Sequence, residues 1–168
     1  MLEFHKSYSD SKKILDELLV GNGVVVFRDV YPIDQINEAK EIVNKFADNQ
    51  EQKETHFNAE AEEAGTIHLQ QRVWNLFGKA KVFSALITHD IIFDLMTKFL
   101  GTEFICGSYC ASRLLPGAVG QEPHIDYPYW DFYNKETFPM GLNSSFPQNC
   151  QVTIPLDICS ELSGATAY

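Results

Sequence analysis

The sequence predicts an α+β domain, with helices in its first part and strands in its second. Apolar residues recur at helical spacing in several windows before Gly101, whereas the runs after residue 103 lack a helical period. Pro and Gly residues separate these later runs, as turns between strands require. Such an order is compatible with an antiparallel barrel or sandwich that carries helices on one face. The length of 168 residues predicts one domain over residues 1–168.

The first hundred residues predict helices around one buried strand. Residues 9–20 form a helical stripe, and residues 24–27, Val-Val-Val-Phe, read as a strand closed by Arg28-Asp29. Pro32 suits the start of a helix that continues to about residue 47, and residues 79–100 predict two further helices ended by Gly101. His89-Asp90 between those two suits a helix cap. The predicted apolar faces comprise Ile14, Leu15, Leu18 and Leu19 in the first helix, and Ile33, Ile36, Val43 and Phe46 in the second.

Residues 48–65 interrupt the apolar pattern with Glu, Gln, Asn, Asp and Ala, which predicts a loop or a solvated helix. His56 and His68 lie in or beside this stretch. Either could bind a metal ion, but an isolated histidine near a polar loop is usually a solvated side chain.

The second part predicts successive strands. Residues 103–115 are expected to form one long strand, followed by a turn at Pro116-Gly117. A short strand containing His124 then precedes a loop rich in aromatic and polar residues, from 127 to 149. Residues 150–157 alternate like a strand, and Pro155 within them indicates an edge or a bulge.

The composition is that of a globular protein, with 45% hydrophobic residues and a formal net charge of −10. This charge argues against nucleic acid or an anionic membrane as a partner, because both attract basic surfaces. We see neither a signal peptide nor an apolar run long enough to span a membrane, so a cytoplasmic protein is expected. The cysteines, which lack Cys-x-x-Cys pairing, are expected to be buried thiols: Cys106, Cys110, Cys150 and Cys159.

The motif His124-Ile125-Asp126 is the strongest candidate for chemistry. Residues two apart in a strand point to the same face, so this imidazole and this carboxylate can approach one cation. Together they provide two ligands of the 2-His-1-carboxylate triad that holds non-haem Fe(II). His-x-Asp alone is a weak signal, since it also occurs at ordinary strand ends. The Pro-Gly turn before it and the aromatic residues after it strengthen the prediction.

Three segments resemble the phytanoyl-CoA dioxygenase family of Fe(II)- and 2-oxoglutarate-dependent oxygenases. They are the helix-strand-helix unit of residues 12–46, the Pro-Gly-to-His-Ile-Asp-Tyr segment of residues 116–127, and residues 152–166, Val-Thr-Ile-Pro-Leu-Asp to Gly-Ala-Thr. All three occur in the family's order and together span most of the chain. The combination is far more specific than His-x-Asp alone.

The resemblance implies a double-stranded β-helix, that is, a cupin-like jelly-roll barrel whose mouth holds the metal. A helical buttress would occupy about residues 1–101 and barrel strands about residues 102–168. The implied enzyme is a dioxygenase that hydroxylates a small organic substrate while 2-oxoglutarate is decarboxylated. His124 and Asp126 would bind Fe(II), and retention of Asp126 favours hydroxylation over halogenation, because related halogenases replace this carboxylate by a small residue.

The family's second iron-binding His and its 2-oxoglutarate-binding Arg would follow the Gly-Ala segment, beyond Tyr168. The expectation from sequence is therefore a barrel that is incomplete at its C-terminus. Two alternatives remain open at this stage: a non-catalytic jelly-roll binding module, and a homo-oligomer in which exposed strand edges bring a partner chain to complete the site.

Further residues are candidates for the surroundings of the metal. Arg113 and Gln151, expected on neighbouring strands, could hydrogen-bond an organic acid such as 2-oxoglutarate, although Arg113 could equally form an ordinary ion pair. Tyr127, Tyr129 and Trp130 could form the wall of the substrate pocket, or simply pack at the rim of the barrel. The family name does not identify the substrate, since it covers diverse hydroxylases.

Overall fold

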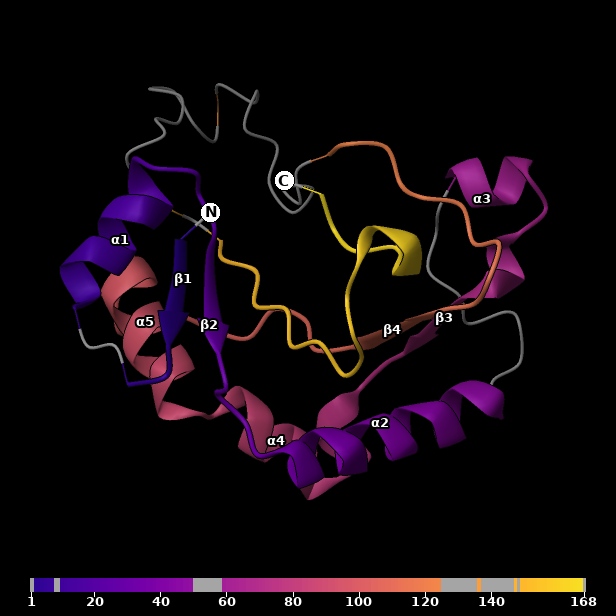
Figure 1. The fold of residues 1–168 in the computed structure, drawn as a ribbon, viewed down its shortest axis with the longest axis horizontal. Helices are drawn as coiled ribbons and strands as arrows, with labels where there is room; N and C mark the ends of the chain where they lie inside the picture. Colours follow the sequence, from indigo (N-terminus) through magenta and orange to yellow (C-terminus); the bar gives the residue numbers. More distant parts are fainter. Residues whose placement is uncertain are drawn as a thin grey trace.

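The structure, a computed structural model, describes residues 2–7, 10–49, 59–124, 136, 147 and 149–167. Figure 1 shows helices and short strands in alternation, which confirms the mixed α and β composition. The helices are α1 (Ser11–Leu19), α2 (Ile33–Asp48), α3 (Ala59–Glu63), α4 (Lys81–Ile87) and α5 (Asp90–Leu100). The strands are β1 (Leu2–His5), β2 (Val25–Arg28), β3 (Gln70–Val73) and β4 (Ala111–Leu114). Three-residue 3-10 turns are η2 (Ile67–Leu69), η3 (Leu76–Gly78) and η4 (Glu161–Ser163).

The first sheet pairs β1 with β2 in parallel, and α1 and α5 lie beside it (Figure 1). Asp10 begins α1 by accepting a hydrogen bond from the Lys13 backbone N–H at 3.1 Å, which satisfies one of the free donors of the first turn. Ile14 is the buried residue of α1. In the sheet, the rings of Phe4 and Phe27 are in contact, with 5.8 Å between their centroids. The sequence prediction missed β1, because a four-residue strand is too short to show a period.

The second sheet pairs β3 with β4 in antiparallel fashion, with Val73 opposite Ala111 and Gln71 opposite Arg113. Residues directly opposite each other share one face of a sheet, and this face is the one that contacts α2. Val73 is 1% exposed and belongs to the main core, which also contains Phe83 and Leu86 of α4. The α2 helix therefore lies on one face of the β3–β4 sheet.

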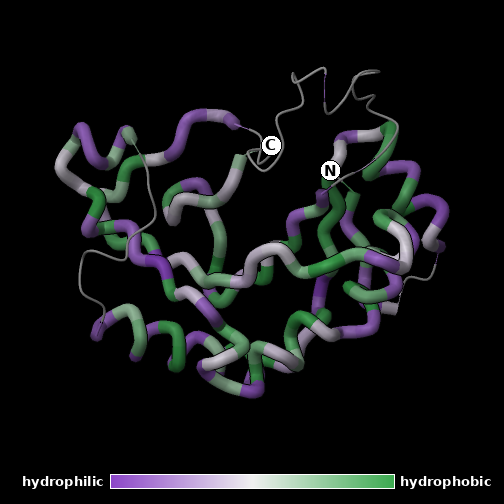
Figure 2. Tube along the Cα trace, turned by 180° about the vertical axis from the view of Figure 1, so that it is seen from behind, coloured by the Kyte–Doolittle hydropathy of each residue, from purple (hydrophilic) through white to green (hydrophobic). Residues whose placement is uncertain are grey.

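The predicted positions of α1, α2, α4 and α5 are confirmed, and the buried face of α2 agrees with the prediction at Val43 and in part at Ile36, but not at Ile33. Ala39, Val43 and Ala47, spaced four residues apart, are buried, whereas Ile33 is 72% exposed. Small side chains allow a helix to approach its neighbours closely, and the larger Ile36 and Ile42 pack partly against the same core. In Figure 2 hydrophobic and hydrophilic residues alternate along this helix, as expected for an element buried on one side.

Of the strands predicted after residue 103, one forms only in part and one does not form, and the short strand expected at His124 is not seen in the described residues 118–124. Only Ala111–Leu114 of the expected strand 103–115 forms a ladder, and residues 150–157 contain no strand. Ile154 and Leu156 instead pack against the main core, and the Asp157 carboxylate pairs with the Lys40 ammonium at 2.7 Å. The alternation in residues 150–157 thus reflects packing against the core, without a hydrogen-bonded partner strand.

The jelly-roll barrel is not confirmed. The described residues form two separate two-stranded sheets and no closed barrel. Within the described ranges, none of the helices combines the length and the apolar composition that a bilayer crossing requires. The expected domain limits stay a prediction.

Two smaller predictions concern the burial of the cysteines and the helix cap at His89. All four cysteines are free thiols, but Cys106 and Cys159 are exposed, so the expectation of uniformly buried thiols is wrong. Burial raises the pKa of the Cys150 thiol. His89 caps α5 as predicted, because its Nδ1 accepts a hydrogen bond from the Ile91 backbone N–H at 3.3 Å.

Two half-buried tyrosines tie α4 to the rest of the molecule. The Tyr31 hydroxyl donates to the Leu86 carbonyl at 2.8 Å, and the Tyr109 hydroxyl donates to the Phe83 carbonyl at 3.0 Å. Burial raises the pKa of Tyr31 to about 12 and that of Tyr109 to about 12. Their neutral forms therefore stabilise the fold below pH 10, where a tyrosine in the unfolded chain is also neutral.

We expect this stabilisation to be lost as the pH rises from about 10, the ordinary tyrosine pKa, through the folded value of about 12. At pH 8, Tyr31→Phe and Tyr109→Phe should each lower the free energy of unfolding by about 0.5–1.5 kcal/mol, because one hydrogen bond is lost. Urea unfolding at pH 8, 10 and 11 measures both effects. The double variant should lose less stability than the unsubstituted protein between pH 8 and 11. An equal loss would refute the stabilising role of the two neutral tyrosine hydroxyls.

Candidate functional site

The segment that leads to His124 begins at the end of β4 and turns back over the start of β3. The Leu115 backbone N–H donates to the Leu69 carbonyl at 2.9 Å, and the Ala118 N–H donates to the Leu115 carbonyl at 3.0 Å. Gly117 has a φ of 90°, a conformation that side chains rarely adopt, so glycine suits this turn. The predicted turn at Pro116-Gly117 is confirmed.

His124 is exposed at the end of this segment, and its Nδ1 lies 2.7 Å from the backbone carbonyl oxygen of Glu122. A carbonyl oxygen only accepts hydrogen bonds, so in the neutral imidazole Nδ1 carries the proton. The lone pair then lies on Nε2. A metal-binding histidine commonly has this arrangement, with one nitrogen held by a backbone carbonyl and the other directed to the ion. The local geometry of His124 therefore fits a metal ligand.

The remaining predicted residues of the metal site and pocket wall lie outside the described residues: Asp126, Tyr127, Tyr129 and Trp130. Within the part of the chain that the structure describes, no three His, Cys, Asp or Glu side chains gather around one point. His68 is exposed in η2, and His56 lies outside the described residues. The pairing of His124 with Asp126 stays a prediction.

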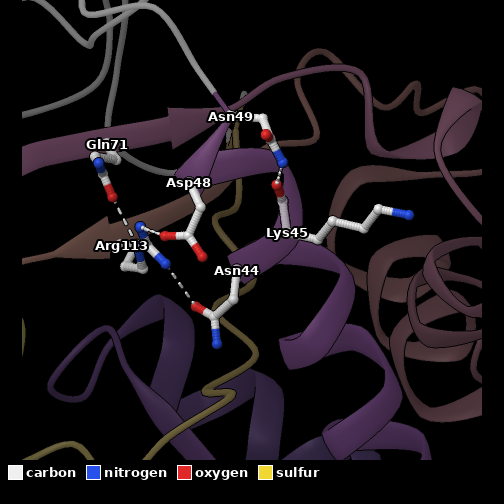
Figure 3. A network of polar contacts seen from close by, with 6 residues as sticks. All are labelled: Asn44, Lys45, Asp48, Asn49, Gln71 and Arg113. Carbon is white, nitrogen blue, oxygen red and sulfur yellow. Dashed lines mark hydrogen bonds and ion pairs between the residues drawn. The ribbon is translucent and has the colours of Figure 1, made fainter.

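Arg113 lies at the centre of a polar network between β4 and the C-terminal end of α2 (Figure 3). Its Nε donates to Gln71 Oε1 at 2.7 Å, its Nη1 to Asn44 Oδ1 at 3.1 Å, and its Nη2 to Asp48 Oδ1 at 2.5 Å. The guanidinium side chain is 21% exposed, so the ion pair is shielded on the arginine side. These contacts match the ion-pair alternative for Arg113.

Gln151 is exposed and belongs to a segment without a strand, so the expected placement of Arg113 and Gln151 on neighbouring strands is wrong. The strand β4 pairs instead with β3, a strand that the sequence prediction did not identify. Whether either side chain binds an organic acid stays a prediction.

Successive side chains of a strand point to opposite faces, so the β3–β4 sheet has a second face. Arg72 lies opposite Ser112, on the face away from the one that Gln71 and Arg113 share with α2. The Arg72 Nη1 contacts Cys110 Sγ at 3.3 Å, and its guanidinium lies 5.4 Å from the centre of the Trp74 ring. The sequence prediction missed this cation because β3, Gln-Gln-Arg-Val, has no alternating apolar pattern.

We expect Arg113→Leu to lower the free energy of unfolding by roughly 1–3 kcal/mol. The substitution removes the shielded guanidinium, so the Asp48 carboxylate and the amides of Gln71 and Asn44 lose their hydrogen-bond donor. Urea unfolding at neutral pH measures this. The matched control is Lys98→Leu, whose ion pair with Asp94 is 40% and 60% exposed and should contribute less than about 1 kcal/mol. Equal losses in the two variants would contradict a structural role for the network.

Comparison with known families gives one match. The family model for phytanoyl-CoA dioxygenase (PhyH) matches residues 19–168, which include β2 to β4, the turn at 116–117 and the His124 segment. A search of curated proteins finds no match.

Proposed function

Because the chain belongs to the phytanoyl-CoA dioxygenase family, we propose that it hydroxylates a small organic substrate, with His124 and Asp126 binding the iron. Membership implies Fe(II)- and 2-oxoglutarate-dependent oxygenase chemistry in general. The substrate class and the ligand residues are our proposal. A family name alone does not determine what a site binds, so the proposal depends on the residues themselves.

The geometry of His124 is the observation that supports this proposal most directly. Its Nδ1–H donates to the Glu122 carbonyl, which fixes the ring and leaves the lone pair on Nε2. Asp126 follows two residues later, so an extended backbone there would direct its carboxylate to the same side. An imidazole nitrogen and a carboxylate oxygen suit Fe(II).

The bound iron, together with 2-oxoglutarate and O₂, would supply the oxidation of a C–H bond to C–OH, while 2-oxoglutarate becomes succinate and CO₂. One oxygen atom of O₂ enters the product alcohol and the other enters succinate. The chain's own part is to hold the metal ligands, to bind the substrate with one C–H bond facing the metal, and to keep water away from it. Tyr127, Tyr129 and Trp130 are our candidates for the apolar wall that excludes water.

Succinate release from 2-oxoglutarate tests the proposal. A purified protein that also carries the family's second iron-binding His and its 2-oxoglutarate-binding Arg, which the resemblance places beyond Tyr168, is incubated with Fe(II), ascorbate, 2-oxoglutarate and O₂, and succinate is measured with and without the iron. We expect release that requires both iron and O₂, because the proposed reaction consumes O₂ and decarboxylates 2-oxoglutarate only with the iron bound. No iron-dependent succinate from the folded protein would favour the alternative of a non-catalytic binding module.

A further inference from the structure

Gln70 is a buried polar residue at the start of β3, next to the segment that leads to His124. It is 6% exposed, and no other polar residue among the described residues is buried as deeply. Its amide nitrogen Nε2 donates a hydrogen bond to the Val119 carbonyl at 2.6 Å. Burying an amide is costly unless its hydrogen bonds are made, so this position needs a specific partner. Val119 provides that partner from the turn after β4.

The turn is therefore held at two places, by the last residue of η2 and the first residue of β3. At its first residue the Leu115 N–H donates to the Leu69 carbonyl at 2.9 Å, and near its end Val119 accepts from Gln70 at 2.6 Å. Leu69 acts through its backbone carbonyl and Gln70 through its side-chain amide, and the two are adjacent in sequence, so one short piece of chain fixes both ends of the loop. Leu69 Cδ1 also lies 3.5 Å from the position that a Cβ on Gly117 would take, which shows close packing of the turn against this residue.

The second attachment shortens the unsupported chain before the metal ligand. His124 is five residues beyond Val119 but nine residues beyond Leu115. The entropic free-energy cost of placing a chain end grows with the logarithm of the free length, so the probability of the placed state falls as its 3/2 power, and losing the Val119 attachment alone would weaken a site at His124 roughly twofold. Gly117 and Gly120 lie in the released stretch and add backbone freedom.

We propose that Gln70 is a positioning residue, whose buried amide holds Val119 and thereby directs His124 toward the metal. This inference rests on the proposed function, since it assumes that His124 binds a metal ion. It predicts that loss of the Gln70 donor weakens metal binding even though Gln70 itself touches no metal. Outer residues that orient a ligand commonly change metal affinity by about tenfold or more.

The test compares Gln70→Met with Gln71→Met. Methionine has nearly the shape of glutamine but cannot donate to Val119. Gln71 is the matched control, because it is the same residue type in the same strand, and its side chain contacts Arg113 on the face toward α2. Binding of Co(II) alone is measured by visible absorption for both variants, for the unsubstituted protein and for His124→Ala. Amide hydrogen exchange is measured for residues 115–124 other than Pro116 and Pro123.

We expect Gln70→Met to bind Co(II) about threefold to tenfold more weakly than the unsubstituted protein, and Gln71→Met to bind it equally well. The amides of Leu115 and Ala118 should exchange faster in Gln70→Met only. Unchanged Co(II) affinity in Gln70→Met, or an equal loss in Gln71→Met, would overturn the proposal. If Gln70→Met does not fold, Gln70→Leu, which also lacks a hydrogen-bond donor and places no charge in the buried site, replaces it.

The two proposals can fail separately. If the folded, unsubstituted protein does not bind Co(II), or if His124→Ala binds it equally well, the assignment of His124 as a metal ligand is wrong, and the positioning role falls with it. Hydrogen exchange would then still decide whether Gln70 holds the turn. If His124→Ala abolishes binding and Gln70→Met leaves it unchanged, only the role of Gln70 is refuted.

Discussion

In the His124→Ala variant we expect iron-dependent succinate release to fall by about 100-fold or more. Removing a group that only orients a metal ligand already costs about 10–100-fold in affinity or activity, and removing the ligand itself should cost at least as much. The His124 side chain is exposed, and its Nδ1 hydrogen bond is to the backbone of Glu122, two positions away, so the substitution removes no buried side chain from the core. The measurement is succinate formed per enzyme at saturating 2-oxoglutarate, with iron concentration varied.

The matched control is His68→Ala. His68 is likewise exposed, lies in η2, and was the alternative metal-binding histidine among the described residues. We expect its substitution to leave succinate release unchanged. If His68→Ala loses activity while His124→Ala keeps it, the ligand assignment is wrong. Unfolding curves of both variants should match that of the unsubstituted protein, which separates loss of iron from loss of fold.

Helices were predictable from the sequence because their signals are local. Asp10 caps α1, Pro32 precedes α2 and Gly101 follows α5, and each of these residues acts on the backbone within one turn. The buried face of α2 was less predictable. Ala39 and Ala47 are buried because of what packs against them, and hydrophobicity alone ranks them below Ile33 and Phe46, which stay partly in solvent.

Strands were harder to predict because a strand exists only when its partner does. Residues 150–157 alternate as a strand would, but they pack on the core without a ladder, and the long strand expected from residue 103 pairs only over Ala111–Leu114. The strand β3 carries two glutamines and an arginine, so no apolar pattern indicated it. Its pairing with β4 decides the surroundings of Arg113 and Gln70.

The candidate site could be predicted as a motif but not as a set of contacts. His-x-Asp and the Pro-Gly turn are visible in the sequence, and the turn is confirmed. The contacts of Arg113 with Asp48 and of Gln70 with Val119 join residues 65 and 49 positions apart, which no local pattern can indicate. Both contacts concern how the segment before His124 is held.

Phe83 should carry the largest single contribution to stability among the described core residues. It is 1% exposed, and its ring meets the Tyr109 ring edge-on at 6.4 Å between centroids. It packs within the core shared by α2, α4 and β3. We expect Phe83→Ala to lower the free energy of unfolding by about 3–5 kcal/mol, because the lost burial is compounded by a cavity that a well-packed core fills only in part.

The matched control is Phe93→Ala, because Phe93 is 46% exposed on α5 and meets the Phe104 ring edge-on at 5.6 Å. Its substitution should cost no more than about 1.5 kcal/mol, since little burial is lost beyond that aromatic pair. Urea unfolding followed by circular dichroism measures both variants. A domain of this kind has only about 5–15 kcal/mol of stability, so Phe83→Ala should shift the midpoint strongly toward lower urea. Equal midpoints for the two variants would mean that the packing of α4 against α2 and β3 is not the main core.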